Sequence, residues 1–190
     1  MKNFVRVAAA LIVCSSAGGA AAQEAAPAAP ATGPLNTITV NPLSLAFGSI
    51  NFEYERATSP TFSWFVGPQY ASFSTSVLDD EFTASSYGLT GGVRFFLTGR
   101  APEGFFISPN ASLGYASAEA GGESASALSY SVGAIGGYTW IFGDVFDLSV
   151  GLGAQYMHTE VAVPDGDGDD LEIGFTGVLP ALRLSLGVAF

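Results

Sequence analysis

Large apolar residues alternate with small or polar residues along most of the chain. In LSYSVGAIGGYTW, residues 128–140, the even-numbered positions carry most of the apolar side chains, and the odd-numbered positions carry serine, glycine and threonine except at Ile135. FDLSVGLGAQY, residues 146–156, repeats the pattern. Successive side chains of a strand point to opposite faces of the sheet. The alternation therefore predicts an all-β fold whose strands have one apolar face and one small, polar face.

The polar face carries few charged residues. Strands that face water normally carry lysine, glutamate or arginine, which discourage edge pairing and aggregation. We therefore expect the small polar face to line a narrow barrel and the apolar face to contact lipid, as in transmembrane barrels with aromatic girdles. A soluble sandwich, in which the aromatics form the core, is the alternative. The expected girdle residues are Phe105, Tyr115, Tyr130, Tyr138, Trp140, Phe146 and Tyr156.

Alternation and turn residues together predict about eight strands in an antiparallel up-and-down transmembrane β-barrel. Seven segments are clear, and an even strand number is the rule for bacterial single-chain barrels. Residues 36–45 are therefore expected to form the first strand, with a bend at 47–49. Pro42 disfavours pairing there, so a short helical turn at 41–48 is the alternative. The seven segments are 50–56, 61–75, 85–98, 105–118, 125–142, 145–159 and a last strand ending at Phe190.

The connections are expected to alternate between short turns and acidic loops. ATSP, GRAPEG and FGD contain glycine or proline and are predicted to be periplasmic turns. VLDDEFT, AEAGGE and VAVPDGDGDDLE carry acidic residues and are predicted to be outer loops. Arg100 lies at a predicted periplasmic turn.

The N-terminus has the three parts of a secretory signal peptide. Lys2 and Arg6 precede a short apolar run and the small residues Ala20 to Ala22, which predicts a cleaved signal at 1–22. Residues 23–35 are rich in alanine and proline and are expected to form a linker before the barrel at 36–190. The single cysteine, Cys14, would be removed with the signal.

Charge argues against a nucleic-acid partner. The full chain has 6 basic and 17 acidic residues, and loss of Lys2 and Arg6 with the signal leaves four arginines, for a net charge of −13. Proteins that bind nucleic acid need basic patches that displace counterions. No cofactor is indicated by the remaining residues.

The last residues, LRLSLGVAF, end an alternating strand on the aromatic Phe190. In this respect the chain resembles small outer-membrane β-barrel proteins of Gram-negative bacteria, in which a terminal aromatic residue is a recognition signal for the barrel assembly machinery. NPLSLAFGSINFEYERA, residues 41–57, also resembles the opening of an uncharacterised family of such barrels. The resemblance implies a cell outer-membrane location, with membrane lipids and the assembly machinery as partners, and implies no catalytic residues.

Parity places four charged residues inside the barrel: Glu53, Glu55, Arg94 and Arg183. Charges in a narrow lumen must be paired, because an unpaired buried charge costs several kcal/mol. We expect the four residues to plug the interior, since the interior of an eight-stranded barrel is just wide enough for side chains to fill. A path for protons or ions is the alternative.

Two further segments have residue types that carry chemistry. DGDGDD places Asp165, Asp167, Asp169 and Asp170 where a loop could wrap them around Ca²⁺, although the spacing differs from that of an EF-hand and a solvated acidic loop is the simpler interpretation. His158 is the only histidine, and it is followed by Thr159 and Glu160. Parity puts His158 on the lipid or interfacial face.

Three functions remain open. The first is a non-enzymatic outer-membrane barrel with a structural or adhesive role, or one that binds lipid or surface ligands through its acidic loops. The second is an outer-membrane lipid hydrolase, similar to lipid A deacylases, that uses His158. The third is a soluble periplasmic barrel that binds an apolar ligand. The sequence favours the first.

Overall fold

The computed structural model describes residues 33–46, 48–77, 80–120, 123–163 and 171–190. The expected signal peptide and residues 23–32 of the expected linker lie outside the described residues. The described chain forms eight strands and one short helix. These elements are β1 (Asn36–Val40), α1 (Pro42–Ala46), β2 (Ser49–Ser59), β3 (Phe62–Val77), β4 (Asp80–Phe96), β5 (Gly104–Ala120), β6 (Glu123–Phe142), β7 (Phe146–Val163) and β8 (Leu171–Ala189).

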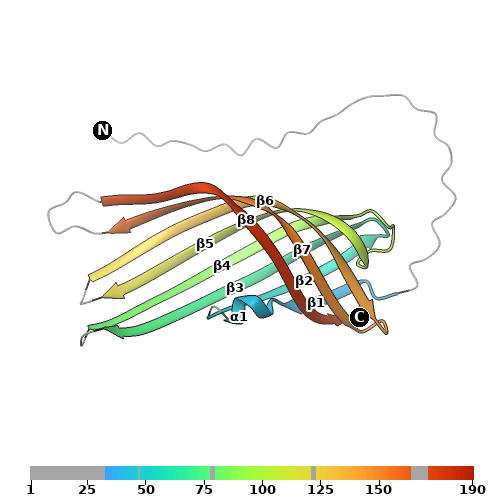
Figure 1. The fold of residues 1–190 in the computed structure, drawn as a ribbon, viewed down its shortest axis with the longest axis horizontal. Coiled ribbons are helices and arrows are strands. Elements are labelled where there is room, and N and C mark those ends of the chain that lie inside the picture. Colours follow the sequence, from blue (N-terminus) through green and yellow to red (C-terminus); the bar gives the residue numbers. More distant parts are fainter. Residues whose placement is uncertain (1–32, 47, 78–79, 121–122, 164–170) are drawn as a thin grey trace, which may run out of the picture. The chain divides into compact units, whose positions relative to one another are not determined.

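The eight strands form a closed antiparallel barrel (Figure 1). Each strand pairs with the next one along the chain, and β1 pairs with β8 from Thr37↔Ala189 to Val40↔Leu186 to close the sheet. Beyond this ladder, the backbone groups of Asn36 and Phe190 exchange hydrogen bonds of 3.0 and 2.9 Å. The prediction of an all-β, up-and-down barrel with eight strands is confirmed.

Two of the predicted outer loops are partly strand. β3 and β4 pair as far as Val77↔Asp80, and β5 and β6 pair as far as Ala120↔Glu123. Strand pairing therefore continues into both segments, and the loops predicted at VLDDEFT and AEAGGE were too long. We call this end of the barrel the loop end and the opposite end, with the β2–β3, β4–β5 and β6–β7 turns, the turn end.

The first strand is shorter than predicted. β1 ends at Val40, and residues 42–46 form α1, so the alternative of a helical turn is confirmed and the strand at 36–45 is corrected. Asn41 begins the helix, because its side-chain Oδ1 accepts hydrogen bonds from the N–H groups of Leu43 at 2.9 Å and Ser44 at 3.3 Å. Pro42 has no N–H for a ladder and suits the first helical position.

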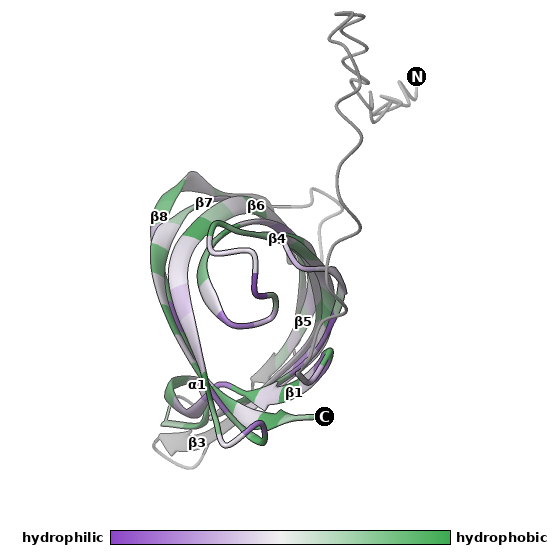
Figure 2. Ribbon diagram, turned by 90° about the vertical axis from the view of Figure 1, so that its right-hand side faces the viewer, coloured by the Kyte–Doolittle hydropathy of each residue, from purple (hydrophilic) through white to green (hydrophobic). Residues whose placement is uncertain are grey.

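Burial is inverted relative to a water-soluble domain. Arg94 and Glu55 are each 1% exposed, whereas Leu182 is 68% and Leu152 is 64% exposed. Apolar and polar residues alternate along β7 and β8 (Figure 2), with the apolar residues on the outside. Ile135 breaks the sequence pattern because it points inward, where it packs against a small apolar cluster. That cluster is Ala57, Phe96, Ala101 and Phe106.

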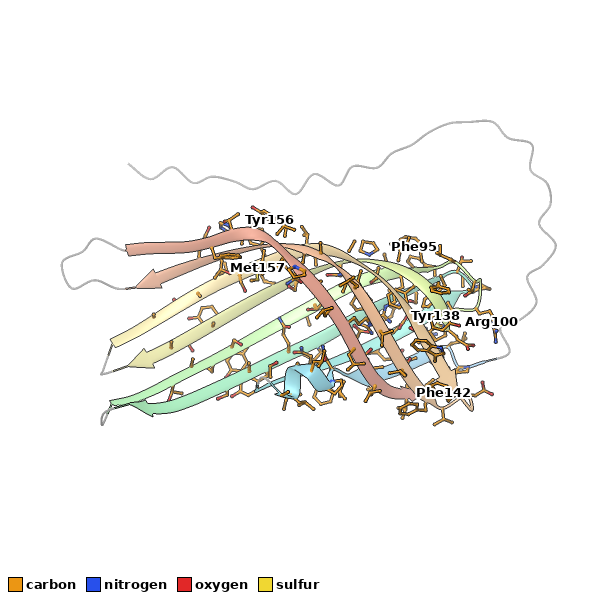
Figure 3. The ribbon with its side chains drawn as sticks, viewed as in Figure 1. Phe95, Arg100, Tyr138, Phe142, Tyr156 and Met157 are labelled. Carbon is orange, nitrogen blue, oxygen red and sulfur yellow. The ribbon has the colours of Figure 1, made fainter. Side chains whose placement is uncertain are left out.

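Aromatic side chains gather at two levels on the outside of the barrel. Phe95, Tyr138 and Phe142 lie toward the same end of the barrel as Arg100, the turn end, while Tyr156 lies farther along the barrel (Figure 3). Edge-to-face or tilted pairs tie neighbouring strands together at both levels, with ring centroids 4.6 Å apart for Phe105–Tyr138 and 5.1 Å apart for Tyr70–Tyr87. The outer surface between the two levels is aliphatic. The tyrosines at the second level are Tyr70, Tyr87, Tyr115, Tyr130 and Tyr156.

Candidate functional site: the charged lumen

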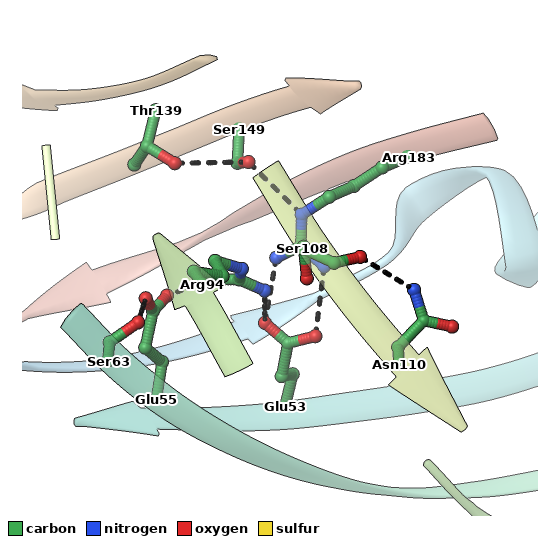
Figure 4. Close-up of polar contacts among 9 residues, drawn as sticks. All are labelled: Glu53, Glu55, Ser63, Arg94, Ser108, Asn110, Thr139, Ser149 and Arg183. Carbon is green, nitrogen blue, oxygen red and sulfur yellow. Dashed lines mark hydrogen bonds and ion pairs between the residues drawn. The ribbon is translucent and has the colours of Figure 1, made fainter. Parts of the chain in front are cut away.

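A cluster of charged side chains crosses the lumen near the turn end. Glu53 and Glu55 come from β2, Arg94 from β4 and Arg183 from β8, and strand alternation turns all four inward. The structure brings the four sequence-predicted residues together (Figure 4). We call these four residues the lumen cluster.

Arg94 and Arg183 share the two carboxylates of the lumen cluster. The guanidinium of Arg94 donates to both Glu53 and Glu55. Arg183 binds Glu53 through two parallel contacts, Nη1–Oε2 at 2.9 Å and Nη2–Oε1 at 2.7 Å. Such paired contacts fix the planes of both groups as well as neutralising charge. Since Glu53 lies between the two bases, it joins β4 to β8 across the lumen.

Neutral hydroxyl groups extend the lumen cluster to the neighbouring strands. Ser63 of β3 donates to Glu55, and the Nε of Arg183 donates to the Oγ of Ser149 at 3.1 Å. Thr139 of β6 donates in turn to Ser149 at 3.2 Å. The hydrogen-bond network therefore joins side chains from six strands across the lumen: β2, β3, β4, β6, β7 and β8.

Aromatic rings close the space around Arg94. Its guanidinium carbon lies 4.6 Å from the ring centroid of Phe65 and 5.3 Å from that of Phe106. Both rings point inward and are almost fully buried, with exposures of 5% and 2%. A guanidinium at these distances is attracted to the ring faces. Charge pairing and aromatic packing therefore fill the same section of the lumen, as the structural interpretation of the cluster requires.

A fifth charged residue, Asp147 of β7, lies in the lumen and was missed from the predicted set. It is 1% exposed, and its Oδ1 has no hydrogen-bond partner among the described residues. The hydroxyl groups of Thr37, Thr39 and Ser185 are likewise buried without a partner there. The signal was present in the sequence, because Asp147 alternates with the apolar face that begins at Phe146.

His158 lies on the outside of β7, next to Tyr130, with the ring centroids 5.0 Å apart. Its Nδ1 lies 2.6 Å from Oγ1 of Thr176 on β8, and its Nε2 lies 3.0 Å from Oε1 of Glu160. Alternation turns Thr159, the hydroxyl residue adjacent in sequence, toward the lumen. The hydroxyl group that reaches His158 is therefore that of Thr176, which the sequence analysis did not single out.

The remaining candidate residues are the aspartates of the predicted calcium loop and the C-terminal Phe190. Asp165, Asp167, Asp169 and Asp170 lie outside the described residues. In the described part of the chain, no group of three or more acidic, histidine or cysteine side chains is placed to hold a metal ion. Phe190 is 58% exposed on the outer face beside β1. None of the helices in the described ranges is both long and apolar enough to cross a bilayer.

One comparison with known proteins gives a match. A family model described as a protein of unknown function (DUF3575) matches residues 11–163, which is most of the chain. No curated protein and no solved structure matches the chain.

Proposed function

The chain belongs to the DUF3575 family of proteins of unknown function, and from that premise we propose that it is a non-enzymatic β-barrel of the bacterial outer membrane. Its role is structural or adhesive, with lipids and surface ligands as binding partners. The observation that carries the proposal is the inverted burial, with charged residues inside and aliphatic residues outside. A water-soluble monomer rarely exposes a large continuous apolar surface.

The dimensions of the apolar surface support the same proposal. On β7 the outward apolar residues run from Phe146 to Tyr156, and on β5 from Phe105 to Tyr115. A membrane-crossing β-strand needs about 9–11 residues, which matches both spans. Aromatic residues bound the two spans, as expected where a barrel meets the two membrane interfaces.

The plugged lumen makes a pore function unfavourable. Phe65, Phe106 and the lumen cluster occupy the section through which a solute would pass. Beyond this section, the sequences of β4, β5, β6 and β8 carry acidic residues at the loop end. That end is the expected place for contacts with surface ligands.

Fractionation tests the proposal. The full chain is expressed in a Gram-negative host, and membranes are washed with alkaline carbonate. We expect the protein to stay in the membrane pellet, to require detergent for release, and to migrate faster on a gel before boiling than after it. Recovery of the folded protein in the aqueous wash would refute the proposal and favour the soluble barrel that binds an apolar ligand.

A second candidate function, hydrolysis of a lipid ester, is favoured by the contacts of His158. A histidine between a hydroxyl group and a carboxylate is the arrangement that activates a nucleophile. In this scheme the hydroxyl oxygen of Thr176 attacks the ester carbonyl while His158 accepts its proton and Glu160 orients the ring. The ester C–O bond then breaks, and His158 gives the proton to the departing alcohol. Water, activated by His158, releases the fatty acid from Thr176 in the same way. Hydrolysis of phospholipid in mixed micelles by the wild type, lost in His158→Ala and kept in Thr159→Ala, would establish it. A wild-type rate equal to that of His158→Ala would rule it out.

A further inference from the structure

The barrel wall has a seam between β2 and β8. β1 pairs with β8 only from Leu186 to Ala189. Among the described residues, β8 from Leu171 to Ser185 pairs with β7 alone. The rest of β8 extends beyond the short β1, toward the opposite end of the barrel (Figure 1). Over this stretch the edge of β8 has no neighbouring strand on the β1 side.

The helix α1 lies in this seam and contacts both β2 and β8. Its polar side is held to the barrel, because Ser49, the first residue of β2, donates to the carbonyl of Ser44 at 3.0 Å. Its apolar side faces outward, with Leu43 and Leu45 exposed. The helix thus covers part of the seam with a surface suited to lipid.

A pocket of about 140 Å³ opens through the rest of the seam. Its inner lining includes the neutral polar side chains of Asn51, Gln69 and Thr90, which alternation turns into the lumen. Its outer lining includes Phe52, Leu182 and Leu184, which point outward. Residues of both kinds line the one pocket, which places it in the lumen beside the unpaired edge of β8.

We propose that this seam pocket binds a single-chain amphiphile with a small, uncharged head group that carries hydroxyl groups. The head group lies among Asn51, Gln69 and Thr90, and the alkyl chain runs outward over Leu182 and Leu184 into the surrounding lipid. The proposal rests on the proposed function, since the alkyl chain needs a membrane around the barrel.

The pocket lining selects this chemistry. Glu53 and Arg183 also line the pocket, but they are already bound to one another at 2.7 and 2.9 Å, so neither offers a free counter-charge to an ionic head group. A cavity of about 150 Å³ accommodates benzene, with six heavy atoms, and a glycerol head group has the same number. The pocket therefore has room for the head group and leaves the alkyl chain outside.

The membrane gives a second reason for an occupant. A strand edge inside the hydrocarbon layer leaves backbone N–H and C=O groups without hydrogen-bond partners, which is unfavourable because lipid tails offer none. The β8 edge between Val178 and Ser185 lies beside the outward apolar residues Val178, Leu182 and Leu184 and thus at the depth of the apolar surface. Hydroxyl groups at this edge both donate and accept hydrogen bonds, so they satisfy either kind of backbone group.

Binding of monooleoylglycerol to the full chain, purified and folded in detergent, tests the proposal by native mass spectrometry. We expect one bound molecule per chain, with oleate and oleylamine at least tenfold weaker. Thr90→Phe, which fills the pocket, should weaken binding at least tenfold. Leu182→Ala should weaken it several-fold, whereas Leu152→Ala, a matched leucine that pairs with Leu182 on β7 but does not line the pocket, should leave it unchanged.

Equal binding to the wild type, Thr90→Phe and Leu182→Ala would overturn the proposal, as would oleate or oleylamine binding as tightly as monooleoylglycerol. A dimer that pairs through the β8 edge and excludes the probe would also overturn it. These results leave the proposed function standing if the protein still fractionates with the membrane. Loss of the protein to the aqueous wash refutes the proposed function, whatever the binding result.

Discussion

Removing Arg94 should destabilise the barrel far more than removing Arg100. Arg94 is 1% exposed and is bound to both Glu53 and Glu55, whereas Arg100 is 73% exposed and makes one contact of 3.2 Å with Glu103. In Arg94→Met, Glu53 keeps Arg183 as a partner, but Glu55 keeps only the hydroxyl of Ser63. The substitution therefore leaves a carboxylate buried without a base.

The expected cost follows from that change. Breaking a buried ion pair from one side costs about 3–5 kcal/mol, and an exposed pair contributes about 0–1 kcal/mol. With a urea dependence of about 2 kcal/mol per M, in the usual range of ~1–3, Arg94→Met should lower the unfolding midpoint by about 1.5–2.5 M. Arg100→Met should lower it by at most about 0.5 M.

Urea titration of the folded protein in liposomes, followed by gel mobility and tryptophan fluorescence, measures both midpoints. A double variant separates lost charge pairing from lost contacts with Phe65 and Phe106. Arg94→Met combined with Glu55→Gln removes both partners, so it should recover most of the lost stability. Equal midpoints for Arg94→Met and Arg100→Met would show that the lumen is wet enough to solvate Glu55. No recovery in the double variant would attribute the loss to packing rather than charge.

Three further substitutions test other parts of the structure. If the aliphatic surface faces lipid, as proposed, Leu152→Arg should destabilise the barrel in liposomes by about 2–4 kcal/mol, whereas Val145→Arg in a turn should cost about 0–1 kcal/mol. Equal urea midpoints would contradict the proposed lipid-facing assignment. Asp147→Asn removes a buried charge whose Oδ1 lacks a partner, so the midpoint should stay level or rise, and a clear fall would reveal a base that binds it. Gly187→Ala places a Cβ 2.0 Å from the carbonyl oxygen of Ile38, so it should lower the free energy of unfolding by about 1–3 kcal/mol. Gly91→Ala is the control, because its Cβ has its nearest contact at 3.6 Å, and it should cost under about 0.5 kcal/mol in the same assay.

The sequence predicted the lumen better than the seam, for a physical reason. Alternation has a period of two, so parity alone turns Glu53, Glu55, Arg94 and Arg183 inward once strands are assigned. Asp147 obeys the same rule, since it lies on the polar face of β7, but it was not included in the predicted cluster. Parity carries no information on how far β1 extends. That limit is set by Asn41, whose side chain satisfies helical N–H groups and competes locally with the ladder.

The sequence also did not predict how far the strands extend at the loop end. Residues such as Asp80 and Glu123 are poor strand formers, which favoured loops at both places. In the structure they begin β4 and β6, where Asp80 pairs with Val77 and Glu123 pairs with Ala120 of the preceding strands. Pairing with an existing neighbour thus outweighs the preference of a single residue. A sequence that is read one residue at a time does not contain that cooperative effect.

The lumen cluster contributes more to the strand register in which the barrel closes than to the free energy of unfolding. Buried ion pairs are weak evidence for stability, because the loss of hydration offsets much of their attraction. Their position is specific, however, because Glu53 of β2 binds Arg183 of β8 across the five-residue β1. A slip of β2 by one residue would turn Glu53 and Glu55 to the apolar face and place Phe52 and Tyr54 in the lumen. The closing ladder of β1 and β8 extends only from Thr37 to Val40, so it discriminates weakly between registers by itself. The ion pairs therefore supply the register specificity that the short strand lacks, which explains why the charges lie at the level where the barrel closes.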